Sequence, residues 1–303
     1  MLANYECDLH GHTNRSDGND SPVEYIRHAV HRGVKILAIT DHDIVPPEMI
    51  ELGGGKRQEI TAYAKGIGVE LLRGIEISCE TYIDDVHLVC LGCDWNAPYF
   101  KELDEFTINS KVNSYRKLID LLNEQGMEMT WEEVLQNNGY PVQEQFVQKK
   151  MIFELMARKG YMESWKEAKL YVKNSKEVSV KREKPDAVSV IKEIHKLGGI
   201  IILAHPYLIS EPVSYKGKEM SRQEFIEVLI EAGLDGIEAS YTYDKTSYGG
   251  TMTKDEIKKE VIERYAGRNY FRRFRLSCRW KERCKESPGN WRVWNYQRGF
   301  HEI

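Results

Sequence analysis

The eleven residues DLHGHTNRSDG, Asp8 to Gly18, follow a short apolar run near the start of the chain. If that run is a strand, residues two apart point to the same side, so His10 and His12 project together from its end. Asp17 follows in a turn and can bring a carboxylate toward the same point. Imidazole and carboxylate ligands together suit Zn, Mn or Fe. Histidines at this spacing also occur by chance on polar strand faces, so the pair alone does not establish a metal site.

Length and composition favour a folded enzyme-sized domain. The chain has 303 residues, of which 41% are hydrophobic and 30% are charged, which suits one large α/β domain or a barrel with an insertion. The net charge of -4 argues against a protein that coats nucleic acid. A small or single-stranded nucleic-acid substrate stays possible, because bound metal ions would supply local positive charge.

The six cysteines show no paired framework. Cys90 and Cys93 have C-x-x-C spacing, but Cys90 falls within an apolar run, so we interpret it as a core residue, with a redox or zinc role as the alternative. Free thiols and the lack of a signal peptide predict a cytoplasmic protein. No apolar run is long enough to span a membrane, and no stable protein partner is evident.

After the first motif, the chain alternates helix and strand. Ser21 is expected to cap a helix over residues 22–31, and the apolar run 34–40 is expected to form a buried strand. In barrels and doubly wound sheets, chemistry gathers at the carboxyl ends of such strands. His42, directly past the strand, is therefore a candidate ligand. Asp41 could orient His42 or bind metal itself.

Two further strands carry ionisable side chains among apolar neighbours. A helix is expected over residues 47–65, followed by a strand over 68–78 that contains Glu76. A carboxylate in an apolar strand is costly unless it is paired or metal-bound, and we favour a bridging metal ligand over a salt bridge. The strand over 84–92 contains His87 as its polar member.

Residues 95–185 differ in character from their flanks. They are charged and poor in strand signals, and we expect a helical insertion between residues 1–94 and 186–270. Helices are expected over residues 115–125, 131–137, 147–159 and 164–172. Lys149, Lys150 and Arg158 are candidate substrate-binding residues that could contact phosphate, although lysines on such helices are usually solvated.

The barrel pattern resumes after the insertion. A helix is expected over 186–197, then a buried strand over 200–204 that ends at His205, another candidate ligand. The remaining elements are expected to be helices over 222–232 and 253–265 and a strand over 234–239.

The candidate metal ligands all lie at or just past the ends of predicted strands; they are His10, His12, Asp17, His42, Glu76, His87 and His205. The chain resembles the PHP (polymerase and histidinol phosphatase) family of metal-dependent phosphoesterases. The matching motifs are Asp8–Gly18, Thr40-Asp41-His42-Asp43, Gly74-Ile75-Glu76-Ile77-Ser78, His87-Leu88 and Ala204-His205-Pro206. The insertion is similar to that of a subgroup of nucleoside 3′,5′-bisphosphate phosphatases and 5′-to-3′ exoribonucleases.

This resemblance implies an α/β fold, a distorted (β/α)7 barrel, with two to three divalent ions, commonly Mn, Zn or Fe. It implies that His10 and His12 hold one metal, that Glu76 bridges to a second and that His87 joins the second. Asp17, His42 and His205 would hold the third and are the residues expected to be catalytic. A metal-bound hydroxide would attack phosphorus.

The leading functional hypothesis is therefore hydrolysis of phosphate esters, in nucleotides or short single-stranded oligonucleotides. The alternatives are a histidinol-phosphate phosphatase, a non-catalytic metal-binding remnant and, less favoured, a metal-dependent amidohydrolase.

The tail over residues 271–303 departs from the family pattern. Family members end with a strand carrying Gly-Ser-Asp-aromatic-His, and this chain has an arginine-rich stretch instead. Back-translated and read one base later, residues 271–281 can encode Phe-Gly-Gly-Ser-Asp-Tyr-His-Ala-Asp-Gly-Lys. We hypothesise a frameshift near residues 266–271 that leaves a non-native or disordered tail. Its missing ligands would have stood where Arg275 and Ser277 now stand. The alternative is a genuine basic tail that binds nucleic acid or a partner.

Overall fold

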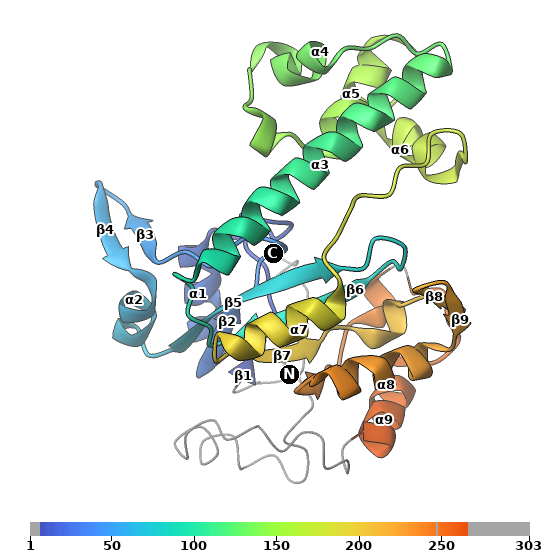
Figure 1. Cartoon of the computed structure of the whole chain (residues 1–303). Helices are drawn as coiled ribbons and strands as arrows, with labels where there is room; N and C mark the ends of the chain where they lie inside the picture. Colours follow the sequence, from blue (N-terminus) through green and yellow to red (C-terminus); the bar gives the residue numbers. More distant parts are fainter. Residues whose placement is uncertain (1–6, 247, 266–303) are drawn as a thin grey trace. The chain divides into compact units, whose positions relative to one another are not determined.

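The sheet that carries the candidate ligands is built from strands on both sides of the insertion. The computed structural model of the chain describes residues 7–246 and 248–265 (Figure 1). Within them, one six-stranded sheet has the order β1-β2-β5-β6-β7-β10. Its strands are β1 (Cys7–Asp8), β2 (Ile36–Ile39), β5 (Glu70–Cys79), β6 (Val86–Leu91), β7 (Ile200–Leu203) and β10 (Gly236–Ile237). The predicted α/β fold is confirmed.

Strand β6 interrupts the parallel order of the sheet. It pairs antiparallel with both β5 and β7, whereas the other neighbouring strands pair parallel. The short connection over residues 80–85 explains this, because a parallel crossover needs a dozen or more residues. The pairing sets His87 opposite Ser78. His87 therefore lies at the carboxyl end of β5, although it is near the start of its own strand.

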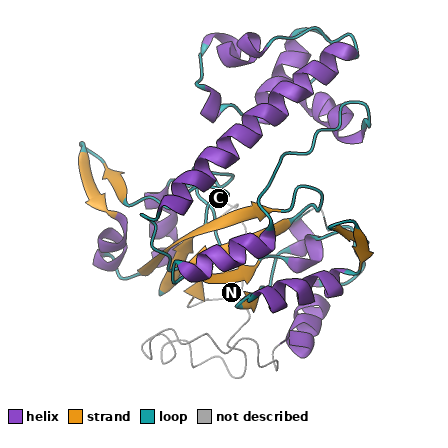
Figure 2. Ribbon diagram, viewed as in Figure 1, coloured by secondary structure: helices purple, strands orange, loops and turns teal. Residues whose placement is uncertain are grey.

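Helices cover the sheet as their apolar faces require (Figure 2). The predicted cap of α1 (Pro22–His31) is confirmed, since the Ser21 side chain accepts a hydrogen bond from the Glu24 amide. Helix α7 (Ala187–Lys196) packs on β6 and β7. Two more helices follow, α8 (Arg222–Ala232) and α9 (Lys254–Tyr265). A hairpin that we did not predict, β8 (Val213–Tyr215) and β9 (Lys218–Met220), precedes α8.

The helix predicted over residues 47–65 is wrong. This segment forms a hairpin, β3 (Met49–Leu52) and β4 (Lys56–Glu59), followed by the short helix α2 (Ile60–Gly66). Gly54 and Gly55 have φ angles of 78° and 76°, which suit a reversing turn and break a helix.

Residues 101–184 form a compact unit separate from the rest of the chain. Helix α3 (Pro98–Glu124) leads into it, and α4 (Trp131–Gln136), α5 (Lys149–Arg158) and α6 (Trp165–Asn174) follow. Short 3-10 turns complete the described chain: η1 (Asn137–Gly139), η2 (Glu144–Phe146), η3 (Pro206–Leu208) and η4 (Tyr243–Lys245). The predicted tail over residues 271–303, with its hypothesised frameshift, lies outside the described residues.

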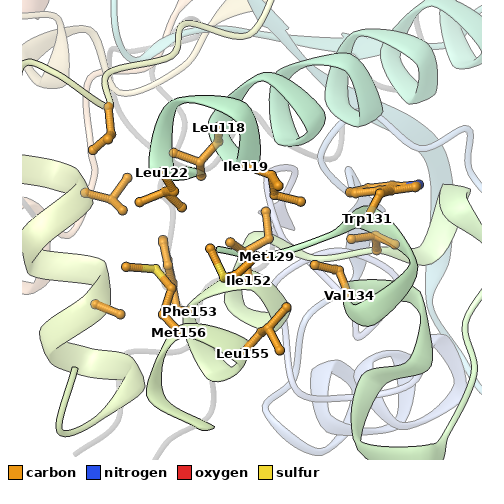
Figure 3. Packing of buried hydrophobic residues seen from close by; sticks show 14 of the residues in the cluster. Leu118, Ile119, Leu122, Met129, Trp131, Val134, Ile152, Phe153, Leu155 and Met156 are labelled. Carbon is orange, nitrogen blue, oxygen red and sulfur yellow. The ribbon is translucent and has the colours of Figure 1, made fainter. Parts of the chain in front are cut away.

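The unit over residues 101–184 has its own apolar core (Figure 3). Leu118 and Leu122 of α3 face Ile152 and Met156 of α5. This core gives the unit a source of stability of its own. Within residues 7–246 and 248–265, every helix is too short or too polar to cross a membrane.

We expect Leu122→Ala to destabilise the unit by about 2–5 kcal/mol, because Leu122 is fully buried and its truncation leaves a cavity. Leu170→Ala is the matched control in the same unit. Leu170 is 57% exposed, so its truncation should change the unfolding free energy by less than about 0.5 kcal/mol. Urea unfolding followed by circular dichroism measures both. Equal effects of the two substitutions would contradict this view of the core.

Candidate metal centre

The predicted ligands converge because the strands that carry them end at one edge of the sheet. His10 and His12 follow β1, His42 follows β2 and His205 follows β7. A parallel bridge between His42 and Glu76 extends the sheet at this point. Glu76, well inside the long strand β5, therefore stands level with the ends of its shorter neighbours.

Five imidazole rings surround the fully buried carboxylate of Glu76. Its Oε2 atom lies 3.1 Å from His10 Nε2, 3.2 Å from His12 Nε2 and 3.1 Å from His42 Nδ1. Its Oε1 atom lies 3.2 Å from His87 Nδ1 and 3.0 Å from His205 Nε2. The nitrogens thus lie around both oxygens of one carboxylate.

Asp17 lies at the exposed rim of this cluster. Its Oδ1 atom is 3.7 Å from His12 Nδ1 and 3.9 Å from His42 Nε2, and its side chain is 46% exposed. Three overlapping sets of side chains have ligand atoms within 4.8 Å of one another and could each hold an ion. They are His10, His12 and Glu76; His12, Asp17 and His42; and His42, Glu76 and His87.

The three sets overlap, so they do not assign each side chain to a single ion, and the assignment that the resemblance implied stays a prediction. We expected His205 to share a metal with Asp17 and His42. In the structure, Asp17 and His42 are grouped with His12, whereas the His205 ring faces Oε1 of Glu76 beside His87. Among the described residues, none of the three sets includes His205.

Electrostatics at the cluster favour a charged Glu76 and neutral rings at His42 and His205. Burial acts to raise the pKa of Glu76, but the surrounding imidazoles, His42 and His10 foremost, hold that pKa well below its usual range. Burial lowers the pKa of His42 to about 4 and also lowers the pKa of His205. Neutral imidazoles offer lone pairs, as metal ligands must.

His10 differs from these two rings. Burial acts to lower the pKa of His10, but the facing carboxylates of Glu76 and Glu238 outweigh burial and raise this pKa well above its usual value. The site therefore favours positive charge between these carboxylates. A proton on the ring provides it, and so would a metal ion.

Two glycines beside His10 and His12 lie where there is little room for a side chain. A Cβ atom on Gly11 would lie 1.8 Å from the Tyr25 hydroxyl, and one on Gly18 would lie 2.3 Å from the His12 carbonyl oxygen. At Gly18 the neighbouring atoms are backbone, so glycine alone fits there, whereas a side chain at Gly11 would require the Tyr25 ring to move. The Gly11 amide donates to Thr40 Oγ1 at 3.0 Å, which fixes the spacer between the histidines to the end of β2.

Asp41 holds the loop that carries Asp17. Its Oδ1 atom accepts hydrogen bonds from the Thr13 amide and the Ser16 hydroxyl, each at 2.7 Å, and its Oδ2 atom accepts one from the Thr13 hydroxyl at 2.7 Å. We expected Asp41 to orient His42 or to bind metal. Both of its oxygens instead bind the loop over residues 13–16.

Two acids beside the cluster, the half-buried Asp8 and the buried Glu238, were missed as site residues. Burial raises the pKa of Asp8 to about 7. Glu238 is 1% exposed and follows β10. A signal for Glu238 was present, because Gly236-Ile237-Glu238 repeats the pattern of Gly74-Ile75-Glu76 at the end of another apolar strand.

The predicted substrate-binding residues belong to the other unit. Lys149, Lys150 and Arg158 all lie on α5. Lys150 is 3.4 Å from Glu154, and its Nζ atom is 5.1 Å from the Trp165 ring centroid. Burial lowers the pKa of Lys149. A role for these three in binding substrate stays a prediction.

The PHP domain family model matches residues 8–270. The chain belongs to the PHP domain family. Its relatives include a 5′-3′ exoribonuclease from Haemophilus influenzae, 30% identical over 66% of this chain and 68% of that protein. A phosphoribosyl 1,2-cyclic phosphate 1,2-diphosphodiesterase from Eggerthella lenta is 26% identical over 76% of this chain and 81% of that protein.

Two further comparisons involve Chromobacterium violaceum. A 3′,5′-nucleoside bisphosphate phosphatase is 38% identical to this PHP domain protein over 87 residues, 29% of this chain and 27% of that one. The structure of an amidohydrolase, at 22% identity, superposes with a TM-score of 0.58 over 86% of this chain and 84% of its own. That likeness supports the fold alone.

We expect Asp41→Asn to destabilise the protein by about 1–3 kcal/mol, because the amide group leaves a buried donor facing Thr13. Asp20→Asn is the control. Asp20 pairs with the exposed His28 ring, and loss of such a pair costs less than about 1 kcal/mol. Urea unfolding of the metal-free proteins measures both. An Asp41→Asn protein as stable as the control would show that Asp41 does not secure the loop.

Proposed function

We propose that this PHP domain protein hydrolyses phosphate esters attached to ribose, in nucleotides or short single-stranded RNA, with divalent metal ions at the histidine cluster. The observation that carries the proposal is the convergence of five imidazoles on the buried carboxylate of Glu76. Without cations, five ring nitrogens compete for the two oxygens of one carboxylate. Cations resolve that conflict by accepting the lone pairs of the neutral rings.

The donor set suits two to three ions of Mn, Zn or Fe, because it mixes imidazole nitrogen with carboxylate oxygen. We propose that Glu76 bridges two of these ions, since its two oxygens face different sets of rings. Bound ions would supply a nucleophile from water near neutral pH and offset the negative charge of the phosphate.

Exposure indicates the side from which substrate approaches. The side chains of His10, Glu76 and His205 are at most 4% exposed, so they close the inner side of the cluster. His42 is 26% exposed and Asp17 is 46% exposed. We propose that the phosphate group reaches the cluster past these two side chains, whose ligand atoms face the open side.

The relatives narrow the substrate class. Their names describe action on RNA, on nucleoside 3′,5′-bisphosphate and on phosphoribosyl cyclic phosphate. A phosphate ester on ribose is common to all three. The histidinol-phosphate alternative lacks this feature, and a non-catalytic remnant would bind metal without turnover.

We expect the Mn²⁺-loaded protein to release phosphate from adenosine 3′,5′-bisphosphate or to shorten a 5′-phosphorylated RNA oligonucleotide, and to leave histidinol phosphate intact. Glu76→Gln should lower kcat by about 100-fold or more, the scale expected for removing one charge-stabilising group. His28→Gln is the control, because His28 is an exposed histidine paired with Asp20.

Metal binding without hydrolysis of any phosphate ester would overturn the catalytic part of this proposal and favour the non-catalytic alternative. Turnover of histidinol phosphate alone would overturn the substrate class. Equal activity of Glu76→Gln and His28→Gln would place the chemistry elsewhere in the protein.

We also propose that the α5 cations contact substrate. Lys149→Ala is expected to raise KM for an RNA oligonucleotide about tenfold with little change in kcat, as loss of one charge-assisted hydrogen bond would do. Lys169→Ala, at an exposed lysine of the same unit, is the control. Identical KM values for the two variants would show that Lys149 does not contact the substrate.

A further inference from the structure

Glu238 is a buried carboxylate beside the cluster that the proposed chemistry does not use. It directly follows β10, and its amide donates to the Leu203 carbonyl at 2.8 Å. Its Oε1 atom is buried without a hydrogen-bond partner. Burying an acid here is costly, so its contacts to neighbouring groups must offset the loss of water.

Those contacts go to two candidate ligands. The Oε2 atom of Glu238 lies 3.4 Å from His10 Nδ1 and accepts a hydrogen bond from the His205 amide at 2.8 Å. His10 follows the first strand and His205 follows a strand beyond the insertion. One oxygen therefore reaches two ligands that lie far apart in the sequence.

The contact to His10 affects which nitrogen of its ring carries the proton. A carboxylate oxygen accepts hydrogen bonds and donates none, so it favours a proton on the ring nitrogen that faces it. In His10 that nitrogen is Nδ1, and the opposite nitrogen, Nε2, faces Glu76. Glu238 thus favours the tautomer whose Nε2 lone pair points into the cluster.

The contact to His205 acts on the backbone. His205 has φ 28° and ψ 58°, a conformation that non-glycine residues rarely adopt. Such a conformation persists where its surroundings hold it. The hydrogen bond from the His205 amide to Glu238 fixes the residue whose ring nitrogen lies 3.0 Å from Glu76.

We propose that Glu238 is a positioning residue for the metal centre, which sets the tautomer and orientation of His10 and anchors the backbone of His205. This inference rests on the proposed metal site, but not on the identity of the substrate. Glu238 would thus act on the metal through His10 and His205 and would not bind the metal itself.

The chain contains a matched control three residues away. Asp235 accepts a hydrogen bond from the Ile201 amide at 3.0 Å, and its Oδ2 atom lies 2.8 Å from His195 Nε2. It is a buried acid with one histidine and one backbone amide, like Glu238. Its histidine, on α7, is outside the three candidate ligand sets.

The experiment measures Zn²⁺ affinity by competition with a chromophoric chelator for the full-length chain and for Glu238→Gln, Asp235→Asn and His10→Gln. Glutamine is uncharged, and the one atom that it places at the Oε2 position faces both groups. An oxygen there is a weaker acceptor than a carboxylate oxygen, and an N–H there would favour the wrong tautomer of His10. We expect Glu238→Gln to weaken Zn²⁺ binding about 10- to 100-fold and Asp235→Asn to leave it unchanged. In the His10→Gln background, Glu238→Gln should have no further effect.

A second readout follows the ring itself. In the Zn²⁺-loaded protein, ¹⁵N NMR should show the His10 Nδ1 proton, with Nε2 bound to metal, and Glu238→Gln should remove that pattern. Unchanged Zn²⁺ affinity in Glu238→Gln, or an equal loss with and without the His10 side chain, would overturn the proposal. A Glu238→Gln chain that fails to fold where His10→Gln folds would also overturn it, because Glu238 would then serve folding.

These outcomes separate the two proposals. Zn²⁺ binding that depends on Glu238, in a protein without phosphoesterase activity, supports the positioning role and contradicts the proposed function. Phosphoesterase activity in a protein whose Zn²⁺ affinity is independent of Glu238 supports the proposed function and contradicts the positioning role. A wild-type chain that binds no metal overturns both.

Discussion

The burial of the Glu76 charge is the constraint on which the site depends. A carboxylate with no exposed surface, within a strand of apolar residues, is unfavourable by several kcal/mol unless charges or hydrogen bonds compensate it. Here imidazoles from four other strands or strand ends supply the compensation. The carboxylate and the rings require each other, and the sheet has to bring them to one place. This requirement explains why the strand ends, the glycines and the loop contacts of the site allow little change in the positions of the rings.

The sheet satisfies this requirement by mixing strand directions. Parallel strands deliver their carboxyl ends to one edge, which accounts for His10, His12, His42 and His205. His87 arrives by a different route, because β6 runs antiparallel and its beginning lies where β5 ends. An orderly βα barrel would place a residue at the start of a strand on the opposite edge. The short turn before β6 therefore adds a candidate ligand that purely parallel topology would exclude.

Much of this arrangement was predictable from local patterns, and the failures have definite causes. Apolar runs located β2 and β7, and a capping serine located α1, because burial and caps leave signals within a few residues. The direction of β6 follows from the short connection after β5, and hydrophobic periodicity does not contain this information. The β3–β4 hairpin was missed because polar, helix-compatible residues flank its glycines, and the turn conformation outweighed their propensity. Glu238 was overlooked although its sequence context matches that of Glu76, because its contacts to His10 and His205 depend on the pairing of strands and not on any local pattern.

Four acids around the cluster have different environments and correspondingly different roles. Glu76 is enclosed by imidazoles, and Asp17 faces solvent at the rim. Both oxygens of Asp41 accept hydrogen bonds from one loop, and Asp41 is outside the three candidate ligand sets. Glu238 contacts one ring and one backbone amide. Residue type alone would make all four equivalent candidate ligands. Their hydrogen-bond partners distinguish acids that could face a metal ion from acids that contact candidate ligands or their loops, and a motif in the sequence does not contain that distinction.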